Sequence, residues 1–121
     1  MILLDTNAVI FLLAAHPRGR PLAVHAGQLA VSPISILELC FLAECGRLHF
    51  PSGDPAATVR RDSRWTIDDP PLDAVIAQAV HLGWTRDPFD RLFAAHALAR
   101  GWRLASSERT LLARLPSTIA I

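Results

Sequence analysis

The chain has 121 residues, of which 51% are apolar and 19% are charged, and its formal net charge is +1. This length can bury the core of one domain without disulfide or zinc cross-links, and the composition excludes a disordered chain. All twelve basic residues are arginine, which excludes P-loop phosphate binding, Schiff-base catalysis and every phosphotransfer site that needs a lysine. The near-neutral charge gives no electrostatic sign of a dedicated nucleic-acid binder.

The sequence shows no pattern of targeting or of membrane insertion. The first residues, MILLDTN, lack the basic start and long apolar core of a signal peptide, and no apolar stretch has the length needed to cross a bilayer. Cys40 and Cys45 stand without a CxxC pair or a histidine cluster, which disfavours zinc and redox roles. We therefore expect a cytoplasmic protein with buried, reduced thiols and no membrane contact.

Strand-like and helix-like patterns alternate along the whole chain, with no repeat or linker. In chain order, the expected elements are a strand over 2–4, a helix over 6–15, a strand over 28–32, helices over 33–46 and 56–63, a strand over 65–67, helices over 72–82 and 88–100, a strand over 102–106, a helix over 108–115 and a strand over 118–121. Short apolar runs mark the strands, and apolar residues at helical spacing mark the helices. Proline near a helix start and glycine after its end support several boundaries.

This alternation in one domain predicts an α/β sandwich with a mostly parallel sheet. Ligand sites in such folds gather at the carboxyl ends of the strands. Asp5 directly follows the first expected strand, so it should lie at that edge. Capping of the next helix explains an aspartate there equally well.

Glu38 is informative because it interrupts an apolar helical face. Projection of the helix over 33–46 places Glu38 among Ile34, Leu37, Phe41, Leu42 and Cys45. A buried carboxylate without a partner costs several kcal/mol or becomes protonated. A bound cation and an arginine ion pair are the two possible partners, and we favour the cation.

Three further acids lie where helices are expected to begin. Asp87 and Asp90 are three residues apart on one helical face; Asp87 suits the cap, which leaves Asp90 as the better ligand candidate. Glu108 begins the helix after the fourth strand, with Ser106 or Ser107 as the expected cap. The helix dipole alone can account for all three acids. Carboxylate oxygens also suit Mg²⁺ and Mn²⁺, which can activate water toward a phosphodiester.

Four segments, in order and spanning essentially the whole chain, read ILLDTNAVIFLL, SPISILELCFL, DPFDRLFAAHAL and RLASSERTL. Together they resemble the motif blocks of the PIN-domain family, and most closely those of the VapC-type toxin ribonucleases with a DPFDR helix. The resemblance implies one PIN domain over residues 1–121 with a flavodoxin-like, three-layer α/β/α sandwich around a central parallel sheet. It also implies a Mg²⁺- or Mn²⁺-dependent endoribonuclease that acts as the toxin of a type II toxin–antitoxin system.

The resemblance assigns roles position by position. The four catalytic and metal-binding acids fall on Asp5, Glu38, Asp90 and Glu108, and the auxiliary positions fall on Thr6, Asn7, Asp87 and Ser106. Asp5 and Asp90 would hold the metal, while Glu38 and Glu108 would complete the negative pocket and help to orient the attacking water. The fourth block usually carries aspartate or asparagine, so the longer Glu108 departs from the family pattern and puts the second metal position and full activity in doubt.

The resemblance also implies partners. RNA would meet arginines at the rim of the pocket, and the candidates are Arg18, Arg20, Arg60, Arg61, Arg64, Arg86 and Arg91, with Arg86, Arg91, Arg18 and Arg20 foremost. A homodimer is expected, as is a cognate antitoxin whose arginine enters the acidic pocket.

Two other functions are compatible with acids at strand ends. A receiver domain or a haloacid-dehalogenase-like phosphatase usually needs a lysine near its aspartates, and the phosphatase also needs a second aspartate where this chain has Asn7. A catalytically silent PIN-fold binding module is the second alternative. The departure at Glu108 leaves that alternative open.

Overall fold

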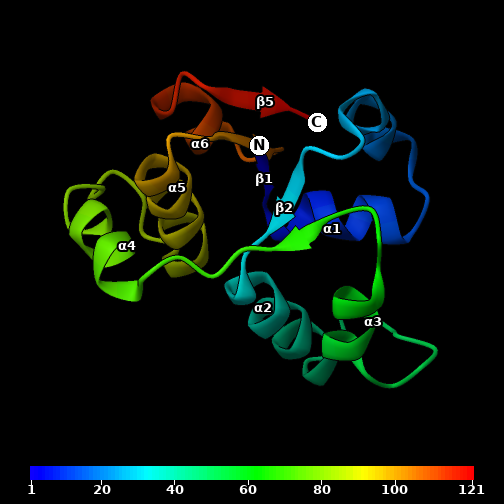
Figure 1. Ribbon diagram of the computed structural model, residues 1–121. Coiled ribbons are helices and arrows are strands. Elements are labelled where there is room, and N and C mark those ends of the chain that lie inside the picture. The colour runs from blue at the N-terminus through cyan, green and yellow to red at the C-terminus, as the bar shows by residue number, and fades with distance from the viewer.

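Five strands pair into one all-parallel sheet in the order β3-β2-β1-β4-β5 in the computed structural model, which describes residues 1–121 (Figure 1). The strands are β1 (Ile2–Leu4), β2 (Leu29–Val31), β3 (Thr66–Ile67), β4 (Arg103–Ser106) and β5 (Thr118–Ala120). The chain builds outward from β1 to β3 and then returns to the other side of β1 with β4. The carboxyl ends of β1 and β4 are therefore the topological switch point, where parallel sheets place their ligands.

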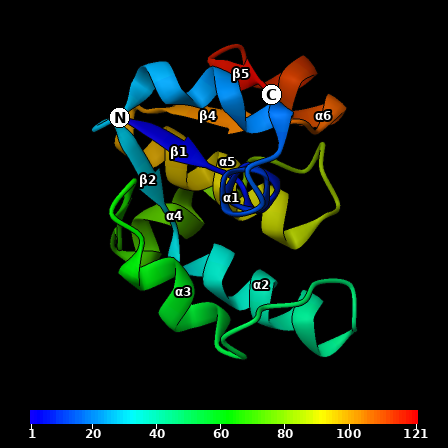
Figure 2. The ribbon, with the colours of Figure 1, turned by 90° about the vertical axis from the view of Figure 1, so that its right-hand side faces the viewer.

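Seven helices cover the two faces of the sheet (Figures 1 and 2). They are α1 (Thr6–Leu13), the 3-10 helix η1 (Pro17–His25), α2 (Pro33–Glu44), α3 (Pro55–Arg61), α4 (Leu72–Ala79), α5 (Pro88–Arg100) and α6 (Arg109–Arg114). The buried side chains of α1, η1, α2 and α3 pack on one face, and those of α4, α5 and α6 pack on the other. These layers confirm the predicted three-layer sandwich.

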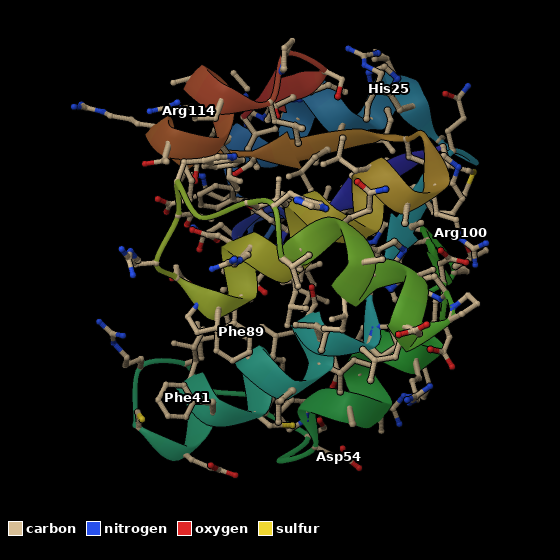
Figure 3. All side chains as sticks on the ribbon, turned by 90° about the vertical axis from the view of Figure 1, so that its left-hand side faces the viewer. His25, Phe41, Asp54, Phe89, Arg100 and Arg114 are labelled. Carbon is tan, nitrogen blue, oxygen red and sulfur yellow. The ribbon has the colours of Figure 1, made fainter.

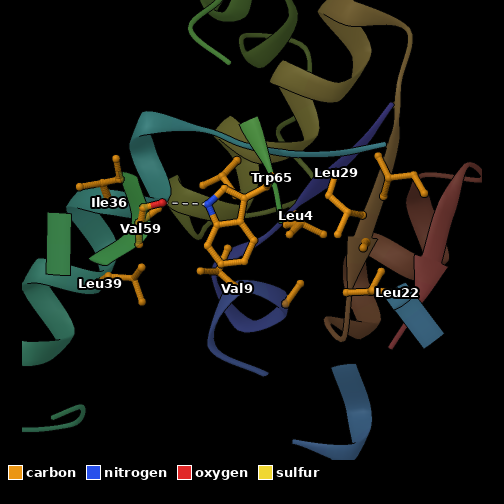
Figure 4. Close-up of a cluster of buried hydrophobic side chains, with 12 residues drawn as sticks. Leu4, Val9, Leu22, Leu29, Ile36, Leu39, Val59 and Trp65 are labelled. Carbon is orange, nitrogen blue, oxygen red and sulfur yellow. Dashed lines mark hydrogen bonds between the residues drawn. The ribbon is translucent and has the colours of Figure 1, made fainter. Parts of the chain in front are cut away.

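The alternation of side chains along β1 divides the core in two. Ile2 and Leu4 belong to one buried cluster and Leu3 to the other, because successive residues of a strand point to opposite faces. Figure 4 shows the first cluster, in which the indole Nε1 of Trp65 donates to the carbonyl oxygen of Val59 at 3.0 Å. This bond satisfies the one polar atom of the indole ring inside an apolar core.

Side-chain caps account for the starts of every helix except α4 and α6. The Ser32 hydroxyl accepts from the Ile34 N–H at 3.1 Å, and the Asp54 carboxylate accepts from the Ala57 N–H at 3.0 Å. The helix α5 ends at Gly101, which adopts a left-handed conformation with φ of 68° that glycine adopts without steric cost. No helix combines the length and the apolar content that crossing a bilayer requires.

Every expected strand and helix is present, with ends shifted by a few residues. One element, η1, was not predicted, because Pro17 and Gly19 indicated only the end of the preceding helix. The buried Leu22 holds this segment against the core. The predicted buried face of α2 was wrong. Its fully buried residues are Ser35, Ile36 and Leu39, whereas Leu37, Phe41 and Cys45 are exposed. Apolar residues surround this helix, so helical projection alone could not identify the inner side.

The expectation for the cysteines was half right. Both thiols are free, but Cys40 is half-buried and Cys45 is exposed. Cys45 lies at the end of α2, where the helix leaves the core.

A polar cluster, in which His96 is buried and Arg100 is exposed, joins the end of β3 to α5. The His96 Nε2 lies 2.7 Å from one Asp68 carboxylate oxygen, and the Arg100 guanidinium contacts both oxygens at 3.0 Å. Burial lowers the pKa of His96, so the neutral ring donates its Nε2–H to Asp68. Burial raises the pKa of Asp68, but the hydrogen bonds from Arg100 and His96 outweigh this effect and lower it.

We expect Asp68→Asn to lower the free energy of unfolding by about 1–2 kcal/mol at pH 7, because His96 and Arg100 lose a charged acceptor. The folded-state pKa of Asp68 lies below its unfolded value, so this stabilisation is present above about pH 4 and is lost as the pH falls further. Urea unfolding at pH 7 and pH 3 measures both effects. Asp62→Asn, which breaks the local pair with Arg64, is the control and should cost less. Equal losses in the two variants would contradict this role for Asp68.

Candidate functional site

Five acidic side chains from separate stretches of the chain converge on one hollow at the carboxyl edge of the sheet. The hollow has a volume of about 130 Å³, and its lining residues are Asp5, Thr6, Asn7, Glu38, Leu42, Asp87, Asp90 and Glu108. The four predicted catalytic acids and three of the four auxiliary residues therefore lie together. The fourth auxiliary residue, Ser106, is fully buried at the end of β4 and hydrogen-bonds to Asp5. We call this feature the acidic hollow.

Asp5 anchors the acidic hollow to the centre of the sheet. Its N–H donates to the Ala105 carbonyl at 3.1 Å, and one carboxylate oxygen accepts from the Ala8 N–H at 2.8 Å. The side chain is only 2% exposed. Asp5 is thus both the cap of α1 and a wall of the hollow, so the two interpretations of this residue hold together.

Ser106 connects the first and fourth acids. Its hydroxyl hydrogen-bonds to the Asp5 carboxylate, and its Oγ accepts from the Glu108 N–H at 3.0 Å. The prediction that a serine caps α6 was wrong, because Glu108 itself occupies the N-cap position and its side chain makes no capping bond. The Glu108 carboxylate is left free to line the hollow. The Asn7 amide, near the start of α1, donates to the hydroxyl of Ser107, which directly follows β4, at 3.4 Å. This bond links the segments that follow β1 and β4.

Helix α2 contributes Glu38 and Leu42, which lie one helical turn apart. Glu38 is half-buried and hydrogen-bonds to the Thr6 hydroxyl, and Thr6 also lies 3.5 Å from the Ser35 hydroxyl. The alternative of an arginine ion pair for Glu38 was wrong, because no ion pair involves any of the five acids. Sequence reasoning missed the contributions of Ser35, Ser107 and Leu42 to the site. Leu42 could have been predicted from the position of Glu38, since residues four apart share a helical face.

The start of α5 contributes two acids in different ways. The Asp87 carboxylate accepts from the N–H groups of Phe89 at 2.9 Å and Asp90 at 3.2 Å, so the predicted cap is confirmed. The Asp90 side chain has no hydrogen-bond partner in the protein and lines the hollow. The Asp90 side chain therefore contributes no hydrogen bond to the fold.

Burial and mutual repulsion raise the pKa values in the acidic hollow. Burial raises the pKa of Asp90 to about 7, and the neighbouring acids add to this effect. Burial raises the pKa of Asp5 to about 6 against the hydrogen bonds of Ser106 and Ala8, with smaller contributions from Glu108 and Glu38. The pKa of Glu38 is raised mainly by burial. Without a counter-charge, the hollow retains protons close to neutral pH.

The donor set of the hollow suits a hard divalent cation. Its polar lining is entirely of oxygen donors apart from the Asn7 amide group, and oxygen is the donor that Mg²⁺ and Mn²⁺ prefer. No three acidic, histidine or cysteine side chains are close enough to enclose an ion directly. Mg²⁺ commonly takes one or two carboxylates and keeps several waters, so these residues fit a partly hydrated ion.

The arginines nominated for RNA contact divide into two groups. Arg91 donates to the Ala79 carbonyl at 2.7 Å at the end of α4, Arg18 donates to the Ile121 carbonyl at 2.6 Å, and Arg64 pairs with Asp62. These three guanidinium groups are engaged within the fold. The remaining candidates are exposed, and they are Arg20, Arg60, Arg61 and Arg86. Arg86 directly precedes Asp87 and so lies beside the hollow; its contact with RNA stays a prediction.

We expect Asp90→Asn to stabilise the metal-free protein at pH 8, on the order of 1 kcal/mol after allowance for solvent screening. The folded-state pKa of Asp90 is about 7, above the unfolded value of about 4. The wild type therefore loses stability through Asp90 as the pH rises from about 4 through 7. The variant lacks this contribution and should lose less, because only Asp5 and Glu38 still have raised pKa values there. Urea unfolding in EDTA across this range measures the difference. Asp73→Asn on α4, outside the hollow, is the control, and a wild type as stable as Asp90→Asn at pH 8 would contradict the repulsion.

Comparison with known proteins places this site in a family. The family model described as "PIN domain" matches residues 2–116. The chain is 34% identical over 117 residues to Ribonuclease VapC22 of Mycobacterium tuberculosis, covering 91% of this chain and 88% of that protein.

Solved structures share the fold over nearly the whole chain. PAE2754 from Pyrobaculum aerophilum aligns with a TM-score of 0.65 at 30% identity, covering 98% of this chain and 87% of that one. A toxin–antitoxin complex from Klebsiella pneumoniae aligns with a TM-score of 0.74 at 19% identity, covering 98% and 96% of the two chains. VapBC2 from Rickettsia felis, bound to a promoter DNA fragment, aligns with a TM-score of 0.70 at 23% identity, covering 100% and 98%. With the family model matching almost the full length, this chain belongs to the PIN-domain family and is similar to the VapC proteins within it.

Proposed function

We propose that this protein is a Mg²⁺- or Mn²⁺-dependent endoribonuclease and the toxin of a type II toxin–antitoxin system. One observation carries the proposal: five carboxylates share a small hollow at the switch point of the sheet and have no cationic partner in the protein. The similarity to a protein named ribonuclease VapC22 supports the choice of RNA. The fold shared with toxin–antitoxin complexes supports the biological setting.

In this mechanism some residues of the hollow bind the cation and others position the attacking water. Asp5 and Asp90 would hold the cation, which supplies Lewis acidity at the scissile phosphate when it is bound. Glu38, oriented by the Thr6 hydroxyl, would position the attacking water and accept its proton, with Glu108 on the opposite wall. The water oxygen would bond to phosphorus while the bond to the 3′ oxygen breaks. The leaving 3′ oxygen would take a proton from solvent, so the products carry a 5′-phosphate and a 3′-hydroxyl.

The same charge pattern supports a protein partner. An arginine of a cognate antitoxin would find several carboxylate acceptors in a hollow that no cationic side chain of this protein lines. Such an arginine would compete with the metal for Asp5 and Asp90 and so block cleavage. A homodimer in the cytoplasm completes the proposed setting.

A nuclease assay tests the proposal with a panel of transfer, ribosomal and messenger RNA. We expect cleavage with Mn²⁺ or Mg²⁺ and none with EDTA, and we expect Asp5→Asn and Asp90→Asn to lower the rate at least 100-fold because each removes a charged ligand. Asp73→Asn should cleave like the wild type. Circular dichroism confirms that each variant is folded. Absence of metal-dependent cleavage across the panel would favour the silent binding module instead.

Glu108 permits a separate test, because it is the position that departs from the family pattern. We expect Glu108→Gln to lower kcat about tenfold or more, since the hollow loses a charge. Glu108→Asp should stay within about threefold of the wild type, because the free side chain is not constrained by a capping bond. If Glu108→Gln cleaves as fast as the wild type, Glu108 has no part in the reaction.

A further inference from the structure

Phe41 differs from every other aromatic residue of the chain in its exposure. The chain has five phenylalanines, three tryptophans and no tyrosine, and Phe41, at 48%, is the only one of the eight that is exposed. Three of the others are covered by arginine side chains: Arg18 lies over Phe11, Arg64 over Trp65 and Arg100 over Trp102. No ring or guanidinium of the protein covers the face of Phe41.

The exposed ring belongs to the stretch of α2 that lines the acidic hollow, although Phe41 is not itself one of the lining residues. Phe41 stands between Glu38 and Leu42 on α2, and both of these residues line the hollow. It is three residues beyond Glu38, which is about 4.5 Å along the helix axis. Figure 3 shows Phe41 and Phe89 on the same face of the molecule, on α2 and at the start of α5; these two helices pack against each other. A ligand in the hollow would therefore extend over Phe41 when it leaves on this side.

We propose that Phe41 is a stacking platform for an unpaired nucleobase of the RNA whose phosphate occupies the acidic hollow. This inference rests on the proposed function and adds one residue outside the acidic hollow that contacts a base of the substrate. Bases next to the scissile phosphate are tethered to it, so they are held within reach of a ring one helical turn from Glu38. An unpaired base can present its π-face to an aromatic side chain whatever its sequence, whereas bases within a duplex are already stacked on each other.

Charge and area favour a base over a protein surface at this position. The carboxylates repel additional phosphates, so contacts beside the hollow are better made through neutral groups. Phe41 and its neighbour Leu37, 59% exposed, are the two exposed large apolar side chains of α2, whereas Leu72, Ile76 and Val80 are exposed on α4. A stable protein interface needs about 800 Å² from each partner, which these two residues cannot supply.

The direct test introduces a fluorescent ring at the platform. Phe41→Trp should retain cleavage, and its added fluorescence, measured against the wild-type background of three tryptophans, should be quenched by a mixed-sequence RNA 12-mer. The matched probe is the same backbone carrying abasic sites, which should not quench. Quenching by both probes, or by neither, would overturn the proposal. This readout does not depend on cleavage, so it remains informative even if the nuclease assay fails.

A steady-state series separates stacking from simple apolar contact. We expect Phe41→Ala and Phe41→Leu to raise KM for single-stranded RNA about fivefold or more, because both lose the π-face, with kcat within about twofold. Phe41→Trp should keep the wild-type KM. Leu98→Ala, an exposed apolar residue near the far end of α5, is the control and should not change KM. An unchanged KM in Phe41→Ala, or a change in oligomeric state by light scattering with RNA binding intact, would assign the ring to something other than RNA while leaving the nuclease proposal standing.

Discussion

The burial of carboxylates beside one another in a single hollow is the constraint on which the rest of this molecule depends. The acidic hollow holds Asp5, Glu38, Asp87, Asp90 and Glu108 without one cationic partner. Burial of such charges costs free energy unless they are protonated or bind a cation. The raised pKa values of Asp5 and Asp90 reflect the free-energy cost of burying their charged forms. A fold that keeps this arrangement gives up stability in its free state.

The fold limits this cost because some of the acids also cap helices or accept hydrogen bonds. Asp5 caps α1 and Asp87 caps α5, so their charges lie beside helix N-termini, where the dipole favours them. Ser106 and Thr6 add hydrogen bonds to Asp5 and Glu38. Asp90 and Glu108 have no such bonds, and they are the side chains most able to adjust to a ligand. Rigid and adjustable donors are thus combined in one site.

Much of this organisation was predictable from local patterns. The strands and helices followed from apolar periodicity and from caps such as Ser32-Pro33 and Asp87-Pro88, because these signals act over a few residues. The resemblance to a family then selected four acids out of eleven. Local patterns failed at η1, where Pro17 and Gly19 indicated only the end of a helix. They also failed on α2, where apolar residues on every side did not reveal which face was buried.

The sequence by itself determined the order of the elements, the parallel sheet and the identity of the acidic residues, because each depends on short-range periodicity or on a motif. Only the tertiary structure decided that Glu38 has no arginine partner, that Glu108 rather than a serine occupies the start of α6, and that Phe41 is left uncovered. It also joined His96 and Arg100 to Asp68. These features depend on contacts between residues far apart in the chain, which no local pattern records.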